Sequence, residues 1–176
     1  MIAYRELMDD ELDPSLFAHF RRYQEVTRCR RRENGLWVIR DIAFTEEWDE
    51  NDYRTLCACL RGTIAGHGGV FAAFSEDGLI GFASVEGKRF GPGEEYVQLS
   101  SLHVSYGLRG GGIGRHLFQL AAERARALGA RKLYISSHSA VETQAFYKAM
   151  GCVEARHYDP TLTAAEPCDC QLEYLL

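Results

Sequence analysis

The chain has 176 residues, of which 46% are hydrophobic and 26% are charged, and its formal net charge is −5 at pH 7. This length suits one domain with its own hydrophobic core, so we expect a single domain over residues 1–176. The net negative charge argues against a nucleic-acid-binding protein, which needs a basic face. No apolar run reaches the roughly 20 residues that cross a bilayer, so we expect no membrane partner.

The N-terminal segment MIAYRELMDDELD is acidic and lacks the basic start and apolar core of a signal peptide, which predicts a cytoplasmic protein. Disulfides are rare in that compartment. Cys57 and Cys59, like Cys168 and Cys170, are separated by one residue rather than the two to four that are typical of zinc sites. We therefore expect no metal site and interpret the cysteines as small, buried apolar residues.

The first elements are a short strand within residues 1–6, where Ile2 and Tyr4 occupy alternate positions, and a helix that begins at Asp13-Pro14. An acidic N-cap followed by proline is a typical helix start, and the apolar residues from Leu16 to Tyr23 recur at helical spacing. The basic run Arg28–Arg32 follows. Because the rest of the chain is acidic, we interpret this run as a solvated face rather than a nucleic-acid contact.

Residues 36–44 are expected to form a short strand or an extended loop, and residues 45–52 begin a helix that ends at Gly66. That helix start holds five carboxylates, Glu46, Glu47, Asp49, Glu50 and Asp52. Two interpretations remain open. The carboxylates either compensate the positive end of the helix dipole, or they form an acidic wall beside a cationic substrate, with Trp48 as an aromatic floor.

Residues 70–74 and 79–86 read as a hairpin, and residues 96–104 as a longer strand. In this strand Val97 and Leu99 are apolar at odd positions, whereas Leu102 and Val104 are apolar at even positions. Side chains alternate between the two faces of a strand, so the change of phase at Ser100-Ser101 predicts a β-bulge. A bulge leaves backbone groups unpaired and splays the strand from its neighbour, which suits a ligand slot.

The remaining pattern predicts a helix over 113–128, a strand over 132–136, a helix over 139–150, a strand over 153–158, a loop over 159–167 and a strand over 170–176. This order indicates an α/β protein with a mixed sheet. The final strand is expected to be exposed and able to pair between two chains, so both a monomer and a homodimer are consistent with the sequence.

The loop Arg109–Gly114 joins a strand to a helix. It is not a Walker loop, because no lysine follows its glycines, and it is not the dinucleotide pattern GxGxxG, whose third glycine would fall at Arg115 or Leu117. What fits is Arg-x-x-Gly-x-Gly starting at Arg109. Successive backbone N–H groups from about Gly110 onward, at a helix N-terminus, are expected to hold a pyrophosphate.

With the strand Leu102-His103-Val104 before it, this pattern resembles the central motif of the GNAT superfamily of N-acetyltransferases. A second motif of that family, Phe/Leu-Tyr-x-x-x-Gly-Phe at a helix end, matches residues 146–152, with Cys152 in place of Phe. The family's asparagine seven residues before the tyrosine is Ala140 here, and Ser139 is expected to supply that contact instead.

The resemblance covers about residues 70–158 and implies the GNAT-like fold, a central, mostly antiparallel mixed sheet with a splayed, bulged strand, flanked by helices. It also implies acetyl-CoA as cosubstrate, with no metal. Its pantetheine arm would pair with the bulged strand as an added strand does. The implied cofactor-binding residues are Leu102, His103, Val104, Arg109, Gly110, Gly111, Gly112, Ile113, Gly114, Arg115 and Ser139.

The same resemblance makes Tyr147 the acid that protonates the departing thiolate, since a phenol with a pKa near 10 is protonated at neutral pH. A backbone N–H near the bulge, from Leu102 or His103, is expected to stabilise the oxyanion. The base stays open. Its candidates are Glu95, with Ser100 and Gln98 as groups that hold water, and the alternatives are Glu86, His103 and His138.

These observations predict an acetyl-CoA-dependent N-acetyltransferase that acts on a primary amine, and the acidic segment 45–52 favours a cationic acceptor. One alternative is a non-catalytic acyl-CoA-binding regulatory module, against which Tyr147 argues. The other is a protein or peptide N-acetyltransferase, which needs an open groove rather than a closed pocket.

Overall fold

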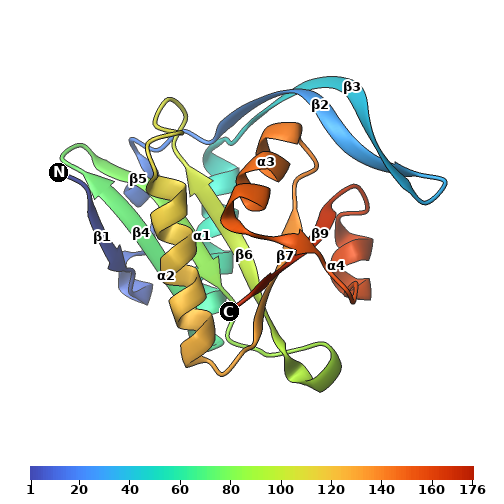
Figure 1. The fold of residues 1–176 in the computed structure, drawn as a ribbon. Helices are drawn as coiled ribbons and strands as arrows, with labels where there is room; N and C mark the ends of the chain where they lie inside the picture. The colour runs from blue at the N-terminus through green and yellow to red at the C-terminus, as the bar shows by residue number, and fades with distance from the viewer.

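The computed structural model describes residues 1–176 and contains a seven-stranded sheet of order β1-β4-β5-β6-β7-β9-β8 and a separate two-stranded sheet, β2-β3 (Figure 1). The strands are β1 (Ala3–Glu6), β2 (Tyr23–Glu33), β3 (Leu36–Glu47), β4 (Gly69–Ser75), β5 (Gly78–Val85), β6 (Tyr96–Val104), β7 (Lys132–Ser137), β8 (Val153–Glu154) and β9 (Cys170–Leu175). The helices are α1 (Glu50–Ala65), α2 (Ile113–Ala127), α3 (Val141–Met150) and α4 (Pro160–Ala165). Every pairing in the large sheet is antiparallel except β6 with β7. The mixed, mostly antiparallel sheet flanked by helices confirms the predicted fold class.

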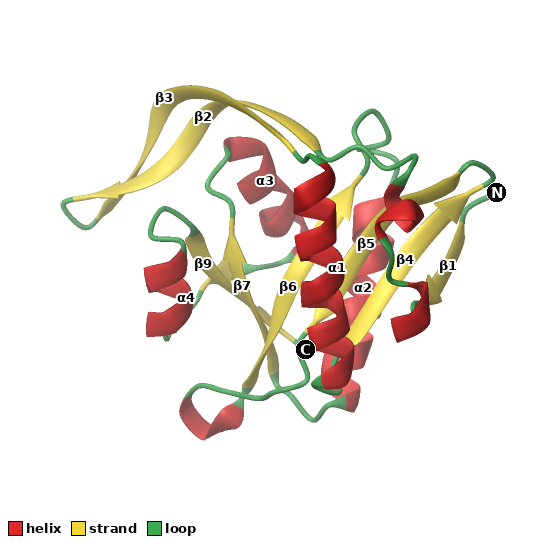
Figure 2. Cartoon of the chain, turned by 180° about the vertical axis from the view of Figure 1, so that it is seen from behind, coloured by secondary structure: helices red, strands yellow, loops and turns green.

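Helices α1 and α2 cover opposite faces of the sheet, as the two opposite views show (Figures 1 and 2). Alternate side chains of each strand therefore enter two different cores. Phe71 of β4 joins the core under α2 and α3, whereas its neighbour Val70 joins the core under α1. Leu117 of α2 and Leu60 of α1 lie at the centres of these cores, at 0% and 1% exposure.

The predicted bulge in β6 is confirmed. Val85 of β5 faces Leu99, and Ser84 faces Ser101, so Ser100 is the extra residue. Because of this insertion, apolar residues on both sides of the bulge point to the same core. Those residues are Val97, Leu99, Leu102 and Val104.

Strands β6 and β7 pair only where Tyr96–Gln98 runs parallel to Lys132–Tyr134. Beyond that point β6 stays with β5 and β7 stays with β9, so the two strands diverge (Figure 1). A buried polar group secures the joined end, where Glu173 accepts a hydrogen bond from the Tyr96 hydroxyl and pairs with Lys132 at 3.2 Å. The diverging end of the sheet is open to a ligand.

The prediction that an α-helix begins at Asp13 is wrong. Asp13 caps a single 3₁₀ turn, Pro14–Phe17, and by Tyr23 the chain has already entered β2. The helical spacing of the apolar residues instead reflects a turn followed by extended chain that packs Phe17 and Phe20 against α1.

The basic run Arg28–Arg32 lies on β2, where Arg28 and Arg32 are exposed, as predicted, and Arg30 and Arg31 are partly buried. Arg31 donates to the Ser139 hydroxyl at 2.5 Å, and Arg32 pairs with Glu154 at 3.0 Å. These contacts hold the β2-β3 hairpin, which arches over α3, against the main body (Figure 1).

Three predictions for the C-terminal part also change. The strand expected over 153–158 is only Val153–Glu154, and the expected loop 159–167 contains α4, which Asp159 caps through two backbone N–H groups. Strand β9 lies between β7 and β8, so it is not the exposed edge that would exchange between chains. None of the helices combines the length and apolar character that a membrane span requires.

Candidate functional site

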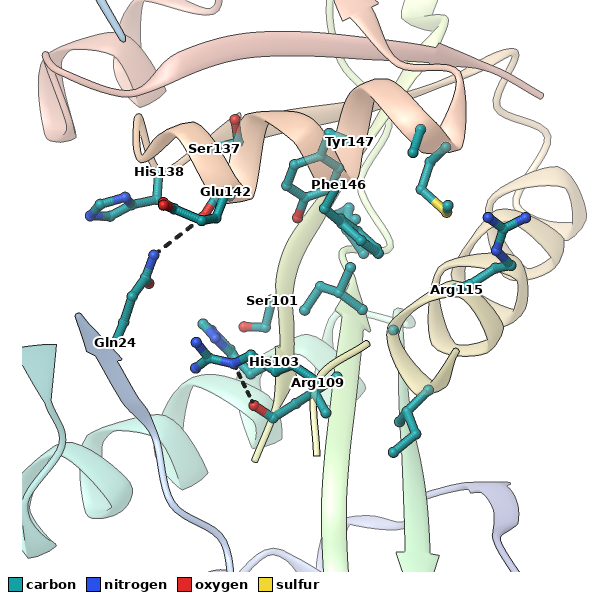
Figure 3. Close-up of a pocket in the computed structure, with 18 of the residues that line it drawn as sticks. Gln24, Ser101, His103, Arg109, Arg115, Ser137, His138, Glu142, Phe146 and Tyr147 are labelled. Carbon is teal, nitrogen blue, oxygen red and sulfur yellow. Dashed lines mark hydrogen bonds between the residues drawn. The ribbon is translucent and has the colours of Figure 1, made fainter. Parts of the chain in front are cut away.

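The opening between β6 and β7 forms a cleft of about 520 Å³. Residues 99–104 of β6, residues 136–138 at the end of β7, the glycine loop and one side of α3 line it. Arg22 and Gln24, at the start of the β2-β3 hairpin, line its remaining side, and Figure 3 shows Gln24 there. Gln24 donates to the Thr143 hydroxyl of α3 at 3.4 Å and so bridges the hairpin and the helix across the cleft.

The glycine loop is shaped so that its backbone N–H groups are free. Gly110 and Gly112 both have φ +86°, a left-handed conformation that favours glycine. At Gly114 a Cβ would lie 3.3 Å from the Phe146 ring, so glycine allows α3 to approach closely. No backbone N–H from Arg109 to Arg115 donates a hydrogen bond within the chain. These donors precede or begin the 15-residue helix α2, an arrangement that favours an anion.

Most of the residues predicted to bind the cofactor line the cleft. They are Leu102, His103, Val104, Arg109, Gly110, Gly112, Ile113, Gly114 and Arg115. Gly111 belongs to the loop but is not part of the cleft wall. Ser139 is buried, accepts its hydrogen bond from Arg31 and does not reach the cleft.

The Arg109 guanidinium turns away from the loop donors. It donates to the backbone carbonyls of Tyr23, at 2.6 Å, and Val104, at 3.3 Å. Arg109 therefore fastens the loop to the start of β2 and places a positive charge at that end of the cleft (Figure 3).

Tyr147 lies on the wall of the cleft with 7% of its surface exposed. Its ring packs against Phe118 and Phe146, and its hydroxyl makes no hydrogen bond within the chain and points toward the space between α3 and β6 (Figure 3). Burial raises the pKa of this phenol above its ordinary value of 10.0, so the hydroxyl keeps its proton at neutral pH.

The extra residue of the bulge, Ser100, also lines the cleft. Its hydroxyl donates to the Glu86 carboxylate at 2.6 Å, and the same carboxylate oxygen accepts from Thr63 of α1 at 2.8 Å. Glu95 lies elsewhere. It precedes β6, pairs with Lys132 at 3.4 Å and is not on the cleft wall. The structure thus brings Ser100 and Tyr147 to one cavity, joins Glu86 to it through Ser100, and leaves Glu95 outside.

The two candidate histidines have different surroundings. His103 packs against Trp48 and Phe82, with ring centroids 5.0 and 5.3 Å away. Burial, aided by the positive charges of Arg22 and Arg109, lowers its pKa to about 3, so this imidazole is neutral at pH 7. His138 accepts a hydrogen bond at Nδ1 from the Ala140 backbone, and its Nε2 lies 3.4 Å from the Glu46 carboxylate.

The acidic segment forms no wall along the cleft, since none of its five carboxylates lines it. Asp49 and Asp52 make a reciprocal capping box at the start of α1, which agrees with the helix-dipole interpretation. The others pair with basic side chains, namely Glu46 with Arg22 and His138, Glu47 with Arg21, and Glu50 with Arg54.

Sequence reasoning missed Arg22, whose side chain is only 7% exposed although it carries a charge. No local pattern marks this residue, because the β2-β3 hairpin carries it to the cleft from a distant part of the chain. No cluster of three or more His, Cys, Asp or Glu side chains has an arrangement that could hold a metal ion, and all six cysteines are free.

The sequence profile described as the acetyltransferase (GNAT) family matches residues 33–152. No curated protein sequence gives a significant match. Among solved structures, the chain is similar to nourseothricin acetyltransferase, with 20% identity, a TM-score of 0.65, and coverage of 98% of this chain and 95% of that chain.

Two of the similar structures that contain coenzyme A or its acetyl ester match almost the whole chain. One is a Bacillus anthracis protein assigned as a streptothricin acetyltransferase, in complex with acetyl coenzyme A, with 14% identity, a TM-score of 0.72 and coverage of 100% and 97% of the two chains. The other is the PaiA N-acetyltransferase of Thermoplasma acidophilum in complex with coenzyme A, with 14% identity, a TM-score of 0.60 and coverage of 100% and 99%. At these identities the likeness shows the shared fold.

Proposed function

Because the chain belongs to the GNAT acetyltransferase family, we propose that it is an acetyl-CoA-dependent N-acetyltransferase that acts on a primary amine. The observation that carries the donor assignment is the run of free backbone N–H groups from Arg109 to Arg115 at the start of α2. Consecutive amides and the helix dipole together suit the two negative charges of a pyrophosphate. Two proteins of the same fold have been solved with acetyl-CoA or CoA, which supports this donor.

The pantetheine arm is proposed to follow residues 102–104 of β6. This part of β6 pairs with β5 but not with β7. Its second edge is therefore open and can accept an extended chain as an added strand. The backbone N–H of Leu102 or His103, just after the bulge, is the proposed donor to the acetyl carbonyl oxygen.

The thioester supplies an electrophilic carbon, to which the amine nitrogen bonds while the carbon–sulfur bond breaks. The proton for the leaving sulfur comes from the Tyr147 hydroxyl, whose burial keeps it protonated. The proton lost by the amine passes through the Ser100 hydroxyl, or a water held by it, to the Glu86 carboxylate. Exchange with solvent then returns both side chains to their starting states.

The closed end of the cleft favours a small acceptor over a peptide. The hydrogen bond between Gln24 and Thr143 crosses that end, whereas an extended peptide needs an open groove. The free hydroxyl of Tyr147 on the cleft wall favours turnover over a purely regulatory acyl-CoA-binding module.

Thermal unfolding with and without acetyl-CoA tests the donor, and release of the CoA thiol across a panel of amines and peptides tests the reaction. Acetyl-CoA at 100 times its Kd should stabilise the fold by about 2.7 kcal/mol through mass action. The absence of any shift at millimolar acetyl-CoA would refute the whole assignment. A shift without thiol release from any acceptor would favour the regulatory module.

A further inference from the structure

His103 is a cleft residue whose imidazole has no hydrogen-bond partner. It lines the cleft, is partly exposed, and neither of its ring nitrogens bonds to another group of the chain. The buried side-chain atoms that lack a partner all belong to Arg22, so the unpaired nitrogens of His103 are open to solvent. The other cleft histidine differs, because His138 accepts from Ala140 at Nδ1 and has its Nε2 3.4 Å from Glu46. Of the two histidines, only His103 has ring nitrogens that are free to bind a molecule in the cleft.

The alternation of side chains along β6 places His103 on the face of the sheet opposite to α2. Leu102 and Val104, on either side of it, pack into the core under α2 and α3. Because neighbouring side chains of a strand point to opposite faces, His103 points to the face that α1 covers, where its ring contacts Trp48 and Phe82. The pantetheine arm is proposed to follow the β6 backbone here, so His103 contacts a molecule that approaches the thioester from the α1 side.

The imidazole of His103 is neutral, which makes it a hydrogen-bond acceptor rather than a base. Burial, aided by the positive charges of Arg22 and Arg109, opposes its protonation. A neutral imidazole accepts a hydrogen bond at one ring nitrogen and donates at the other. Since no bond within the chain fixes the position of the ring hydrogen, either nitrogen can present its lone pair to the cleft. His103 can therefore hold an N–H group without removing its proton.

We propose that His103 is a catalytic residue that accepts a hydrogen bond from the acceptor amine and thereby orients the amine lone pair toward the thioester carbon. The inference rests on the proposed N-acetyltransferase function. A neutral primary amine has two N–H groups. One stays bonded to His103 and remains in the product as the amide N–H. The other loses its proton along the Ser100 route, as the nitrogen–carbon bond forms and the carbon–sulfur bond breaks. The nitrogen becomes more positive as it bonds, which strengthens its hydrogen bond to His103 in the transition state.

This arrangement uses both N–H groups of the acceptor, so it selects primary over secondary amines. A secondary amine has a single N–H, which the reaction removes, and it therefore leaves His103 without a partner. The test compares the fastest primary amine of the panel with its N-methyl derivative, using thiol release to obtain kcat/KM per concentration of neutral amine. The ratio of the two values should be roughly 10-fold higher in the wild type than in a variant without the imidazole, as expected for one hydrogen bond. An equal ratio in the two proteins would overturn the inference.

Substitutions at position 103 separate the hydrogen bond from the shape of the ring. His103→Phe keeps an aromatic ring against Trp48 and Phe82 but removes the lone pair, so kcat/KM for the primary amine should fall roughly 10-fold. The amide oxygen of either His103→Asn or His103→Gln should recover most of that loss, because it also accepts a hydrogen bond. His116→Phe is the matched control, since His116 also stacks on an aromatic ring, Tyr4, but lies outside the cleft. Failure of both amide variants to recover activity would overturn the hydrogen-bonding role.

Failure of the inference and failure of the proposed function give different results. The acetyl-CoA melting shift verifies that each variant is folded, and His103→Leu, with a smaller side chain, takes the place of His103→Phe if the latter does not fold. Variants that acetylate primary amines as fast as the wild type refute the role of His103 and leave the proposed function intact. A wild-type protein that binds no acetyl-CoA, or releases no thiol with any acceptor, refutes the proposed function itself.

Discussion

The two ends of the cleft are built in different ways. The donor end comes from one continuous segment, residues 99–115, which runs from the β6 bulge through the glycine loop into α2. The proposed acceptor end is lined by Arg22 and Gln24 at the start of β2, His138 after β7, and Glu142 and Thr143 of α3, which come from three separate parts of the chain. The first end depends on local backbone geometry, whereas the second depends on how the β2-β3 hairpin packs.

This difference has a chemical consequence. The donor end offers backbone N–H groups, which every residue type but proline possesses, so its requirement is mainly for conformation. The proposed acceptor end offers buried side-chain charges, so we expect a single substitution there to change the sign or shape of what is recognised. We therefore expect acceptor choice to vary independently of acetyl-CoA binding. The following predictions break or sharpen this comparison, in order of decreasing effect.

Gly112→Glu should destroy the donor end alone. Position 112 has φ +86°, so a side chain is strained there, and the new carboxylate enters a site proposed to hold phosphates. Strain and like-charge repulsion should weaken acetyl-CoA binding by roughly 10²-fold or more, measured by titration calorimetry. Gly93→Glu is the matched control, because Gly93 has φ +64° and open space around it but lies away from the cleft. Retained binding in Gly112→Glu would contradict the phosphate site.

Tyr147→Phe should lower the rate of acetyl transfer, because Tyr147 lies between the donor end and the acceptor end of the cleft. Removing only the hydroxyl should lower kcat by roughly 10²-fold, as expected for loss of a general acid, and leave the Kd for acetyl-CoA nearly unchanged. The ring contacts with Phe118 and Phe146 persist, so the fold should be intact. If kcat is unchanged, Tyr147 takes no part in proton transfer.

His103 should make the acceptor end sensitive to acid. The pKa of His103 is about 3 in the folded protein, whereas its ordinary value is 6.5. Below pH 6.5 this histidine is therefore protonated in the unfolded chain but stays neutral in the folded protein. Stability is therefore lost as pH falls from 6.5 toward 3, and this residue should account for about 1 kcal/mol between pH 7 and 5.5.

Urea unfolding of His103→Asn at these two pH values measures that contribution. The variant should lose about 1 kcal/mol less stability than the wild type on acidification. His19→Asn, at an exposed position, should keep the wild-type dependence. Identical pH dependence of His103→Asn and the wild type would mean that His103 is not held neutral by its surroundings.

Prediction from the sequence succeeded where a local rule decides the structure. The phase change at Ser100 required a bulge whatever else the chain did, since alternation along a strand is strict. It failed at Asp13, where a capping residue and helical spacing fit a 3₁₀ turn equally well, and at β9, whose neighbours are set by pairing with distant strands. Short strands such as β8, with two residues, leave almost no periodic signal.

By itself, the sequence determined the donor end of this protein. The glycine loop, the bulged strand before it and Tyr147 are contiguous or nearby motifs, and the chemistry proposed for them follows from backbone conformation and residue type. Only the tertiary structure decided the acceptor end. It placed the acidic segment in the cap of α1 and in ion pairs, left Glu95 with Lys132, and buried Arg22 with unpaired donors. Burial and long-range pairing set the charge of that end, and neither is encoded in the spacing of neighbouring residues.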